Sequence, residues 1–178
     1  MAASSAILQK IENGGYDAQL TRLYGAEHLD AQRARYLAAA KGFLDTFGDG
    51  EGELMLFSAP GRTEIGGNHT DHNHGRVIAG SVDLDVIAVV RPAEGTVRVK
   101  SEGYPMDTVA LDALAPVESE KNHSASLIRG VAKGIVDAGG KVGGFDCYST
   151  SSVLRGSGLS SSAAFEVCVG AILRGEYN

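Results

Sequence analysis

The sequence contains no tryptophan, only two cysteines, and no apolar run that approaches the length of a membrane span. A transmembrane helix needs roughly 18 or more consecutive apolar residues, so membrane attachment is not expected. Cys147 and Cys168 both lie in apolar segments, and we predict small buried side chains rather than a disulfide framework. Residues 1–10 lack a basic segment followed by an apolar core, so no secretory signal is predicted. These features favour a cytoplasmic protein.

Positive charge is also in short supply, because 16 Lys and Arg face 22 Asp and Glu, for a formal net charge of −6. Nucleic acids and anionic membranes bind to a basic face, so we expect neither of them as a partner. A single anionic ligand remains compatible with this balance, since local dipoles and a bound Mg²⁺ can override the net charge.

The pattern of apolar residues predicts an α+β fold over residues 1–178, as one domain or as a fragment of a larger protein. Hydrophobic residues make up 43% of the chain, which is enough for a core. Helices are predicted over Ala6–Glu12, Asp17–Tyr24, Ala31–Phe47, Ser124–Ala138 and Ala163–Leu173. Strands are predicted over Glu53–Ser58, Val77–Arg91, Thr96–Lys100, Asp107–Leu111 and Gly144–Val153. We expect an antiparallel meander with helices packed on one face of the sheet.

Glycine, in contrast, is abundant, with 24 residues, and it dominates the stretch from Gly156 to Ala164 that leads into an apolar helix. Glycines allow a backbone to approach a ligand closely, and the free N–H groups of a helix start attract phosphate. A serine oxygen can also ligate Mg²⁺. We interpret the stretch as a triphosphate-binding loop for ATP, although no Lys follows the glycines as in a Walker motif. The alternative is a flexible linker, but a strand enters and an apolar helix leaves.

A second polar stretch, Pro60–Gly75, is predicted to be a long loop that begins with a turn at Ala59–Gly61. Arg62 offers a forked donor for phosphate, and the side chains of Asn68, His69 and Asp71 suit several hydroxyls of one sugar. Two alternatives remain open. A transition metal fits the cluster His69, Asp71, His72 and His74, and a solvated turn-rich loop needs no ligand at all. We expect His72, His74, His28 and His123 to be turn or surface residues.

Together the two stretches resemble the first two motifs of the GHMP small-molecule kinases and, within that superfamily, the galactokinase family. The galactokinase signature, roughly Gly-Arg-x-Asn-x-Ile-Gly-Glu-His-x-Asp-Tyr, is similar to residues 61–72. The nucleotide motif, Gly-x-Gly-Leu-Ser-Ser-Ser-Ala, is matched at every fixed position by residues 156–163. The chain departs from the pattern at Asn68, where the family usually has Glu, and at Glu64, where it has Asn. The Pro often found before the nucleotide glycines is also absent.

The resemblance implies an amino-terminal GHMP-kinase domain, with a mixed sheet and a left-handed βαβ unit. It implies phosphate transfer from MgATP to the anomeric hydroxyl of α-D-galactose, a step of galactose metabolism. Arg62 would stabilise the transferring phosphoryl group or hold the base ionised, and Asn68, His69, Thr70 and Asp71 would bind the sugar. The triphosphate would be wrapped by Gly156, Ser157, Gly158, Leu159, Ser160, Ser161 and Ser162, with the Ser162 hydroxyl on Mg²⁺. Ser101 falls at a position that can touch the nucleotide.

Members of the family are much longer than 178 residues, and their general base, second Mg²⁺ ligand and carboxy-terminal domain would lie after Asn178. We therefore expect the chain alone to be inactive. The helix Ala163–Leu173 is apolar nearly all round, so we expect it to be buried on all sides by a missing carboxy-terminal segment or an oligomer partner. Three other functions remain open: a non-catalytic galactose and ATP sensor, a kinase acting on N-acetylgalactosamine, and a metal-binding protein.

Overall fold

The computed structural model describes residues 3–67, 73–153, 156 and 158–178, with the backbone alone for residues 3–5. The helices are α1 (Ala3–Glu12), α2 (Asp17–Tyr24), α3 (Leu29–Phe47), α4 (Ser124–Asp137) and α5 (Ser161–Tyr177), with short 3-10 turns at η1 (Ala26–His28) and η3 (Glu118–Glu120). The strands are β1 (Met55–Gly66), β2 (Ile78–Ala93), β3 (Thr96–Ser101), β4 (Met106–Ala110) and β5 (Gly144–Ser151). Each helix and strand predicted from the sequence is present, and the largest difference in bounds is at the end of β1.

The sheet is mixed, with the strand order β1-β2-β5-β3-β4, so the expectation of a simple antiparallel meander is wrong. β5 inserts between β2 and β3, antiparallel to the first and parallel to the second. Gly144 makes the insertion possible, because a Cβ there would lie 2.5 Å from the Thr96 carbonyl oxygen and 2.9 Å from that of Ala93. The parallel pair is connected through β4 and α4, which gives the βαβ unit implied by the resemblance.

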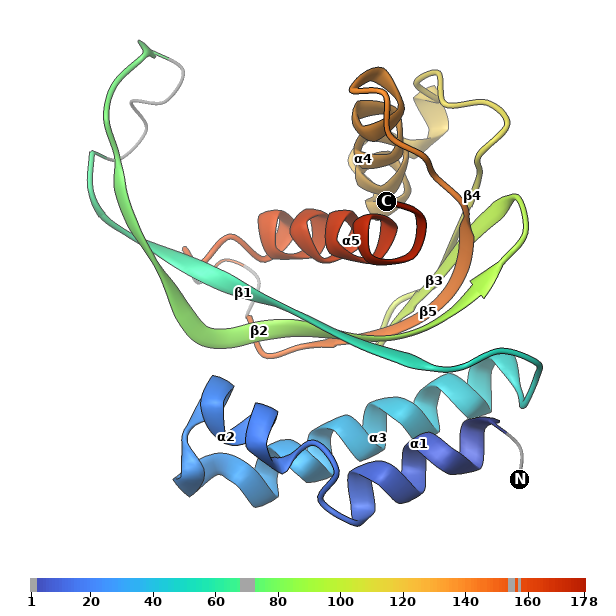
Figure 1. Cartoon of the computed structure of the whole chain (residues 1–178). Coiled ribbons are helices and arrows are strands. Elements are labelled where there is room, and N and C mark those ends of the chain that lie inside the picture. The colour runs from blue at the N-terminus through green and yellow to red at the C-terminus, as the bar shows by residue number, and fades with distance from the viewer. Residues whose placement is uncertain (1–2, 68–72, 154–155, 157) are drawn as a thin grey trace.

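Helices cover both faces of this sheet, and not one face as predicted (Figure 1). α1, α2 and α3 lie on one side, and α4 and α5 lie on the other. The central part of β2 shows why. Val86, Ala88 and Val90 pack beneath α4 and α5, whereas Ile87 and Val89 pack against α1–α3. An uninterrupted apolar run is typical of a strand buried on both faces, and residues 86–90 form such a run.

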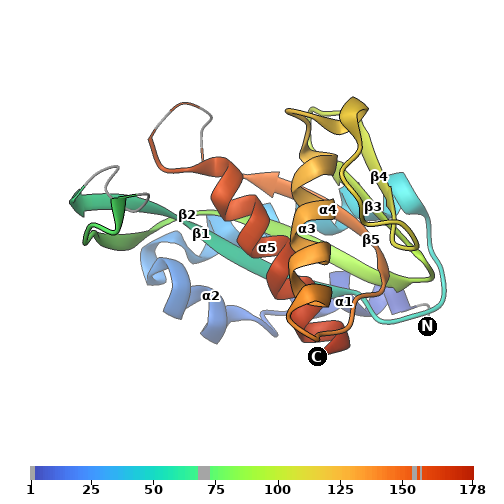
Figure 2. The same cartoon turned by 90° about the horizontal axis from the view of Figure 1, so that it is seen from above.

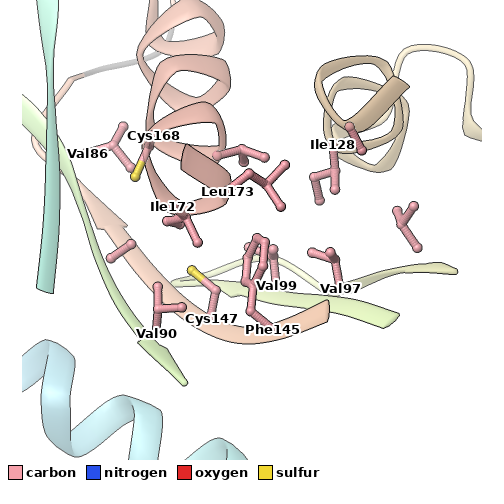
Figure 3. Close-up of a cluster of buried hydrophobic side chains, with 14 of the residues drawn as sticks. Val86, Val90, Val97, Val99, Ile128, Phe145, Cys147, Cys168, Ile172 and Leu173 are labelled. Atoms are coloured by element: carbon pink, nitrogen blue, oxygen red, sulfur yellow. The ribbon is translucent and has the colours of Figure 1, made fainter. Parts of the chain in front are cut away.

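The core beneath α4 and α5 is formed by side chains from all five strands and both helices, and Figure 3 labels residues from β2, β3, β5, α4 and α5. Phe145 and Cys147 of β5 contribute from the sheet, and Ile128 and Leu173 contribute from the helices. Cys147 and Cys168 are free and buried, as predicted. Burial raises the pKa of the Cys168 thiol to about 12, so this side chain behaves as a small apolar group.

α5 crosses this core beside α4 (Figure 2). Cys168, Ile172 and Leu173 are buried against the sheet and α4, but the Val167 side chain is 60% exposed. One apolar position of α5 thus faces outward in the described chain, and its coverage by a carboxy-terminal segment or an oligomer partner stays a prediction. No helix within the described ranges is long and apolar enough to cross a bilayer.

β1 does not turn at Ala59–Gly61 as predicted, but continues through Pro60 and Gly61 to Gly66. It remains paired with β2 over this length, with register shifts between Pro60 and Arg62 and between Glu64 and Gly66. β2 pairs with β5 only from Val86 onward, so residues 78–85 pair with β1 alone in the described chain. β1 and β2 thus extend beyond the rest of the sheet as a two-stranded ribbon (Figure 1). The first half of the predicted polar loop belongs to this ribbon.

The two positions on α5 give a direct test of this packing. Ile172→Ala should lower the free energy of unfolding by about 2–5 kcal/mol, because it leaves a cavity between the helix and the sheet. Val167→Ala, on the exposed side of the same helix, should change it by less than about 0.5 kcal/mol. Urea denaturation followed by circular dichroism measures both, and similar losses for the two variants would contradict the placement of α5.

Candidate functional site

The two polar motifs, far apart in the sequence, meet where β1 passes the glycine-rich loop. The backbone N–H of Arg62 donates a hydrogen bond to the carbonyl oxygen of Leu159, with an N–O distance of 3.2 Å. At the preceding position a Cβ would lie 3.1 Å from the same oxygen and 3.2 Å from Cγ2 of Val153. Gly61 is therefore the residue that lets the ribbon backbone lie directly against the loop.

The loop leads into α5 through a backbone in which three of the described residues are left-handed. Gly156 and Gly158 have φ values of +76° and +78°, and Ser160, at the start of the helix, has φ +58°. The Ser160 side chain makes no capping hydrogen bond with the described residues, and the first helical bond runs from Ala164 N to Ser160 O at 3.0 Å. The N–H groups of the first turn are therefore directed away from the helix, where they can bind an anion.

Hydroxyl groups surround this helix start. Ser162 is exposed in the first turn of α5, and Ser160 and Ser161 are half-buried. An exposed serine oxygen beside an anion-binding helix start is suitably placed for a Mg²⁺ that accompanies phosphate. Ser157, the remaining hydroxyl of the motif, lies outside the described residues. The described part of the loop thus offers hydroxyl and backbone donors of the kind that bind anions.

Arg62 lies on the ribbon, with 44% of its side chain exposed. One guanidinium nitrogen donates to a carboxylate oxygen of Glu64 at 3.0 Å. Partly exposed ion pairs of this kind contribute little to stability, about 0–1 kcal/mol. A phosphate group can therefore replace Glu64 as the partner of this guanidinium at small cost.

Ser101, at the end of β3, is placed on the same face of the sheet as α5. Its hydroxyl shares a hydrogen bond of 2.9 Å with that of Ser149 in the neighbouring strand β5. Ser149 follows Phe145 and Cys147 at alternate positions, and these two side chains pack beneath α4 and α5. Within the described residues, Ser101 is thus linked to β5 rather than to the glycine-rich loop.

The predicted sugar-binding residues Asn68, His69, Thr70 and Asp71 lie outside the described residues, as does His72. His74 is exposed with φ +57°, and His28 and His123 are exposed, as predicted for turn and surface residues. The described part of the chain holds no group of three or more His, Cys, Asp or Glu that could bind a metal. Because most of the histidine cluster is not described, the metal alternative stays untested.

We call the contact of Gly61 and Arg62 in β1 with Val153 and Leu159 the junction. A buried carboxylate that the sequence analysis did not identify lies close to it. Asp85 is 2% exposed and accepts hydrogen bonds from Arg35 at 2.6 Å, from Ser58 at 2.5 Å and from the Tyr24 hydroxyl. Burial and the Asp85 carboxylate raise the pKa of Tyr24, which keeps this phenol protonated as a donor. The partners come from α2, α3 and β1, so no local pattern around Asp85 signals its burial.

The structure also contains a cleft of about 410 Å³ on the α1–α3 side of the sheet. Its lining includes Ile11, Leu20, Leu23, Tyr24, Tyr36, Leu56, Phe57, Ser58, Asp83 and Asp85. Among the described lining residues, the charged ones are two acidic residues, Asp83 and Asp85. Asp85 is paired with Arg35, and the described lining includes no cationic side chain that could hold a triphosphate. The junction on the α5 side, where Arg62 lies against the glycine-rich loop, is therefore the candidate site for an anionic ligand.

The contact at Gly61 can be tested with a matched pair of substitutions in β1. Gly61→Ala should lower the free energy of unfolding by about 1–3 kcal/mol, because the new methyl group forces the loop away from the ribbon. Gly66→Ala is the control, since a Cβ there has nothing within 4 Å among the described atoms, and it should change stability by less than about 1 kcal/mol. Thermal and urea unfolding measure both. Equal stability of the two variants would contradict the close approach.

A protein-family model described as the galactokinase galactose-binding signature matches residues 41–92. Galactokinase from Clostridium tetani is 34% identical over 131 residues, which cover 72% of this chain and 33% of that protein.

Among solved structures, Lactococcus lactis galactokinase complexed with galactose is similar with a TM-score of 0.70 and 29% identity, over 78% of this chain and 36% of that one. Methanococcus jannaschii mevalonate kinase shares the fold, with a TM-score of 0.57 and 18% identity, over 72% of this chain and 42% of that one. The chain spans about a third of the length of the two galactokinases. It belongs to the galactokinase family of GHMP kinases and corresponds to the amino-terminal portion of these proteins.

Proposed function

We propose that this chain supplies the sugar loop and the ATP loop of a galactokinase, which phosphorylates α-D-galactose at its anomeric hydroxyl. The observation that carries the proposal is the hydrogen bond between Arg62 N and Leu159 O, because it holds the two motifs against each other. Phosphoryl transfer depends mainly on bringing donor and acceptor together and on stabilising charge. A rigid contact between an ATP loop and a sugar loop serves this need.

MgATP, the phosphoryl donor, would bind with its phosphates on the loop from Gly156 to Ser162. The left-handed glycines support this placement, as do the first-turn N–H groups of α5, which Ser160 does not cap among the described residues, and the exposed Ser162 hydroxyl for Mg²⁺. Leu159 would contribute backbone groups, and Ser157, Ser160 and Ser161 would add further donors. Ser101 remains a weaker candidate for a nucleotide contact, since its hydroxyl already bonds to Ser149.

Galactose would bind to Asn68, His69, Thr70 and Asp71, which follow directly on the end of the β1 ribbon. Support comes from the galactose-binding signature at residues 41–92 and from the likeness to a galactokinase complexed with galactose. A carboxylate such as Asp71 can accept two neighbouring sugar hydroxyls, and an amide such as Asn68 both donates and accepts. Asn68 leaves the choice between galactose and N-acetylgalactosamine open to experiment.

In the reaction, a bond forms between the anomeric oxygen of galactose and the γ-phosphorus of ATP. The bond from that phosphorus to the β–γ bridging oxygen breaks, and ADP leaves. The proton of the sugar hydroxyl passes to a general base, which the family resemblance places beyond Asn178. Arg62 would stabilise the negative charge of the transferring phosphoryl group, after exchanging its partner Glu64 for phosphate. We therefore propose that the complete polypeptide is an enzyme and that these 178 residues alone are inactive.

A coupled assay of ADP release tests the proposal. With MgATP, the complete polypeptide should release ADP only when galactose is present, and ³¹P NMR should show galactose 1-phosphate. The 178-residue chain assayed alone should show no galactose-dependent release. Galactose binding without turnover in the complete polypeptide would favour a sensor, faster turnover of N-acetylgalactosamine would favour the other sugar kinase, and a stoichiometric transition metal would favour the metal-binding alternative.

The role of Arg62 gives a separate prediction. Arg62→Lys keeps the charge but loses the forked geometry, so kcat of the complete polypeptide should fall about 10- to 100-fold. Arg174→Lys, at the exposed end of α5, is the matched control and should leave kcat unchanged. Steady-state kinetics at saturating galactose and MgATP measure both. A kcat for Arg62→Lys equal to that of the unmodified protein would remove Arg62 from the proposed mechanism.

A further inference from the structure

The entrance of the glycine-rich loop is fixed by a hydrogen-bonded cluster around the main chain of Asp85. Ser152 directly follows the end of β5 and begins the connection to the loop. Its N–H donates to the Asp85 carbonyl oxygen at 2.9 Å, and its hydroxyl accepts from the Asp85 N–H at 2.9 Å. The hydroxyl also lies 3.1 Å from that carbonyl oxygen, to which it donates. The regular pairing of β2 with β5 ends one residue earlier, at Val86 and Ser151.

The same Asp85 is held from the opposite face of the sheet. Its carboxylate accepts from Arg35, Ser58 and Tyr24, and a second nitrogen of Arg35 donates to the Asp85 carbonyl oxygen at 3.0 Å. The Arg35 guanidinium thus donates hydrogen bonds to both the side chain and the main chain of Asp85. A charge pair of this kind is costly to break, because Asp85 is almost completely buried. The position of Asp85 is therefore rigid relative to α2 and α3.

The two ends of the connection are thus anchored differently. Ser152 is bonded to Asp85 at the entrance, and Leu159 is bonded to Arg62 near the exit. Val153, which follows Ser152, is 3% exposed and lies against the position of Gly61. A shift of Ser152 would therefore move its neighbour Val153, and with it the surface of the connection that lies against Gly61.

We propose that Ser152 is a positioning residue for MgATP binding, acting through its hydrogen bonds to Asp85, which Arg35 holds in place. This inference rests on the proposed function of the loop as the ATP site, and it extends that function to a residue outside both motifs. Ser152 need not touch the nucleotide; it sets where the loop starts. The Asp85 cluster on the α2 and α3 side of the sheet thereby determines the geometry of the anion-binding loop on the other side.

The test compares two Ser→Ala substitutions that each remove one hydroxyl bonded to Asp85. Ser152→Ala should weaken the binding of MgATP about tenfold, since it loses the two hydrogen bonds of the hydroxyl at the loop entrance and keeps only the one from the backbone N–H. Ser58→Ala removes a carboxylate donor on β1 but no bond to the loop, so MgATP affinity should stay within about twofold. Ser152→Thr retains the hydroxyl and should restore binding. Isothermal titration of the complete polypeptide with MgATP gives the dissociation constants of the three variants and of the unmodified protein.

Two further measurements separate positioning from a general loss of stability. The KM for galactose should be the same for Ser152→Ala and the unmodified protein, whereas the KM for MgATP should rise. Thermal unfolding should show that Ser58→Ala destabilises the fold at least as much as Ser152→Ala. If the unmodified protein binds no MgATP, the proposed function fails. If it binds MgATP and Ser152→Ala binds equally well, or if Ser58→Ala weakens binding as much, the positioning role is overturned.

Discussion

The close approach of two backbones at Gly61 is the constraint on which the proposed site depends. A side chain at this position would contact the Leu159 carbonyl oxygen and the Val153 side chain, and it would separate the ribbon from the loop. Without a side chain, the next residue can donate its N–H to Leu159. One hydrogen bond of this kind contributes only about 1 kcal/mol, so its importance is geometric. It places Arg62 beside the start of α5, where phosphate is expected to bind.

The two-sided sheet supports this geometry. β5 occupies the centre of the sheet because Gly144 lets it enter between β2 and β3. The glycine-rich loop follows the end of β5. The core beneath α4 and α5 holds the helix that starts at the loop, as Figure 3 shows for Cys168, Ile172 and Leu173. The core on the other face holds α2 and α3, whose side chains donate hydrogen bonds to Asp85. The helices on one face therefore fix the start of α5, and those on the other face fix Asp85 and, through it, Ser152.

The sequence predicted the individual elements better than their arrangement. The apolar periodicity of α4 and the start and stop residues of the segment Asp17–Tyr24, Asp17 and Gly25, were sufficient, because both signals are local. The course of β1 was predicted wrongly, since Pro60 and Gly61 usually mark turns, but register shifts accommodate them within a strand. The burial of Asp85 could not be predicted, because its partners come from three distant elements. The two motifs were identifiable from residue types alone, whereas their contact depends on tertiary structure.

A crystal structure of the complete polypeptide with galactose and a non-hydrolysable MgATP analogue is the most direct test of the central claim. The account predicts that the phosphates lie on the backbone N–H groups at the start of α5, with the anomeric hydroxyl facing the terminal phosphate beside Arg62. Triphosphate bound in the cleft beneath α2, or galactose bound away from the end of the β1 ribbon, would contradict it.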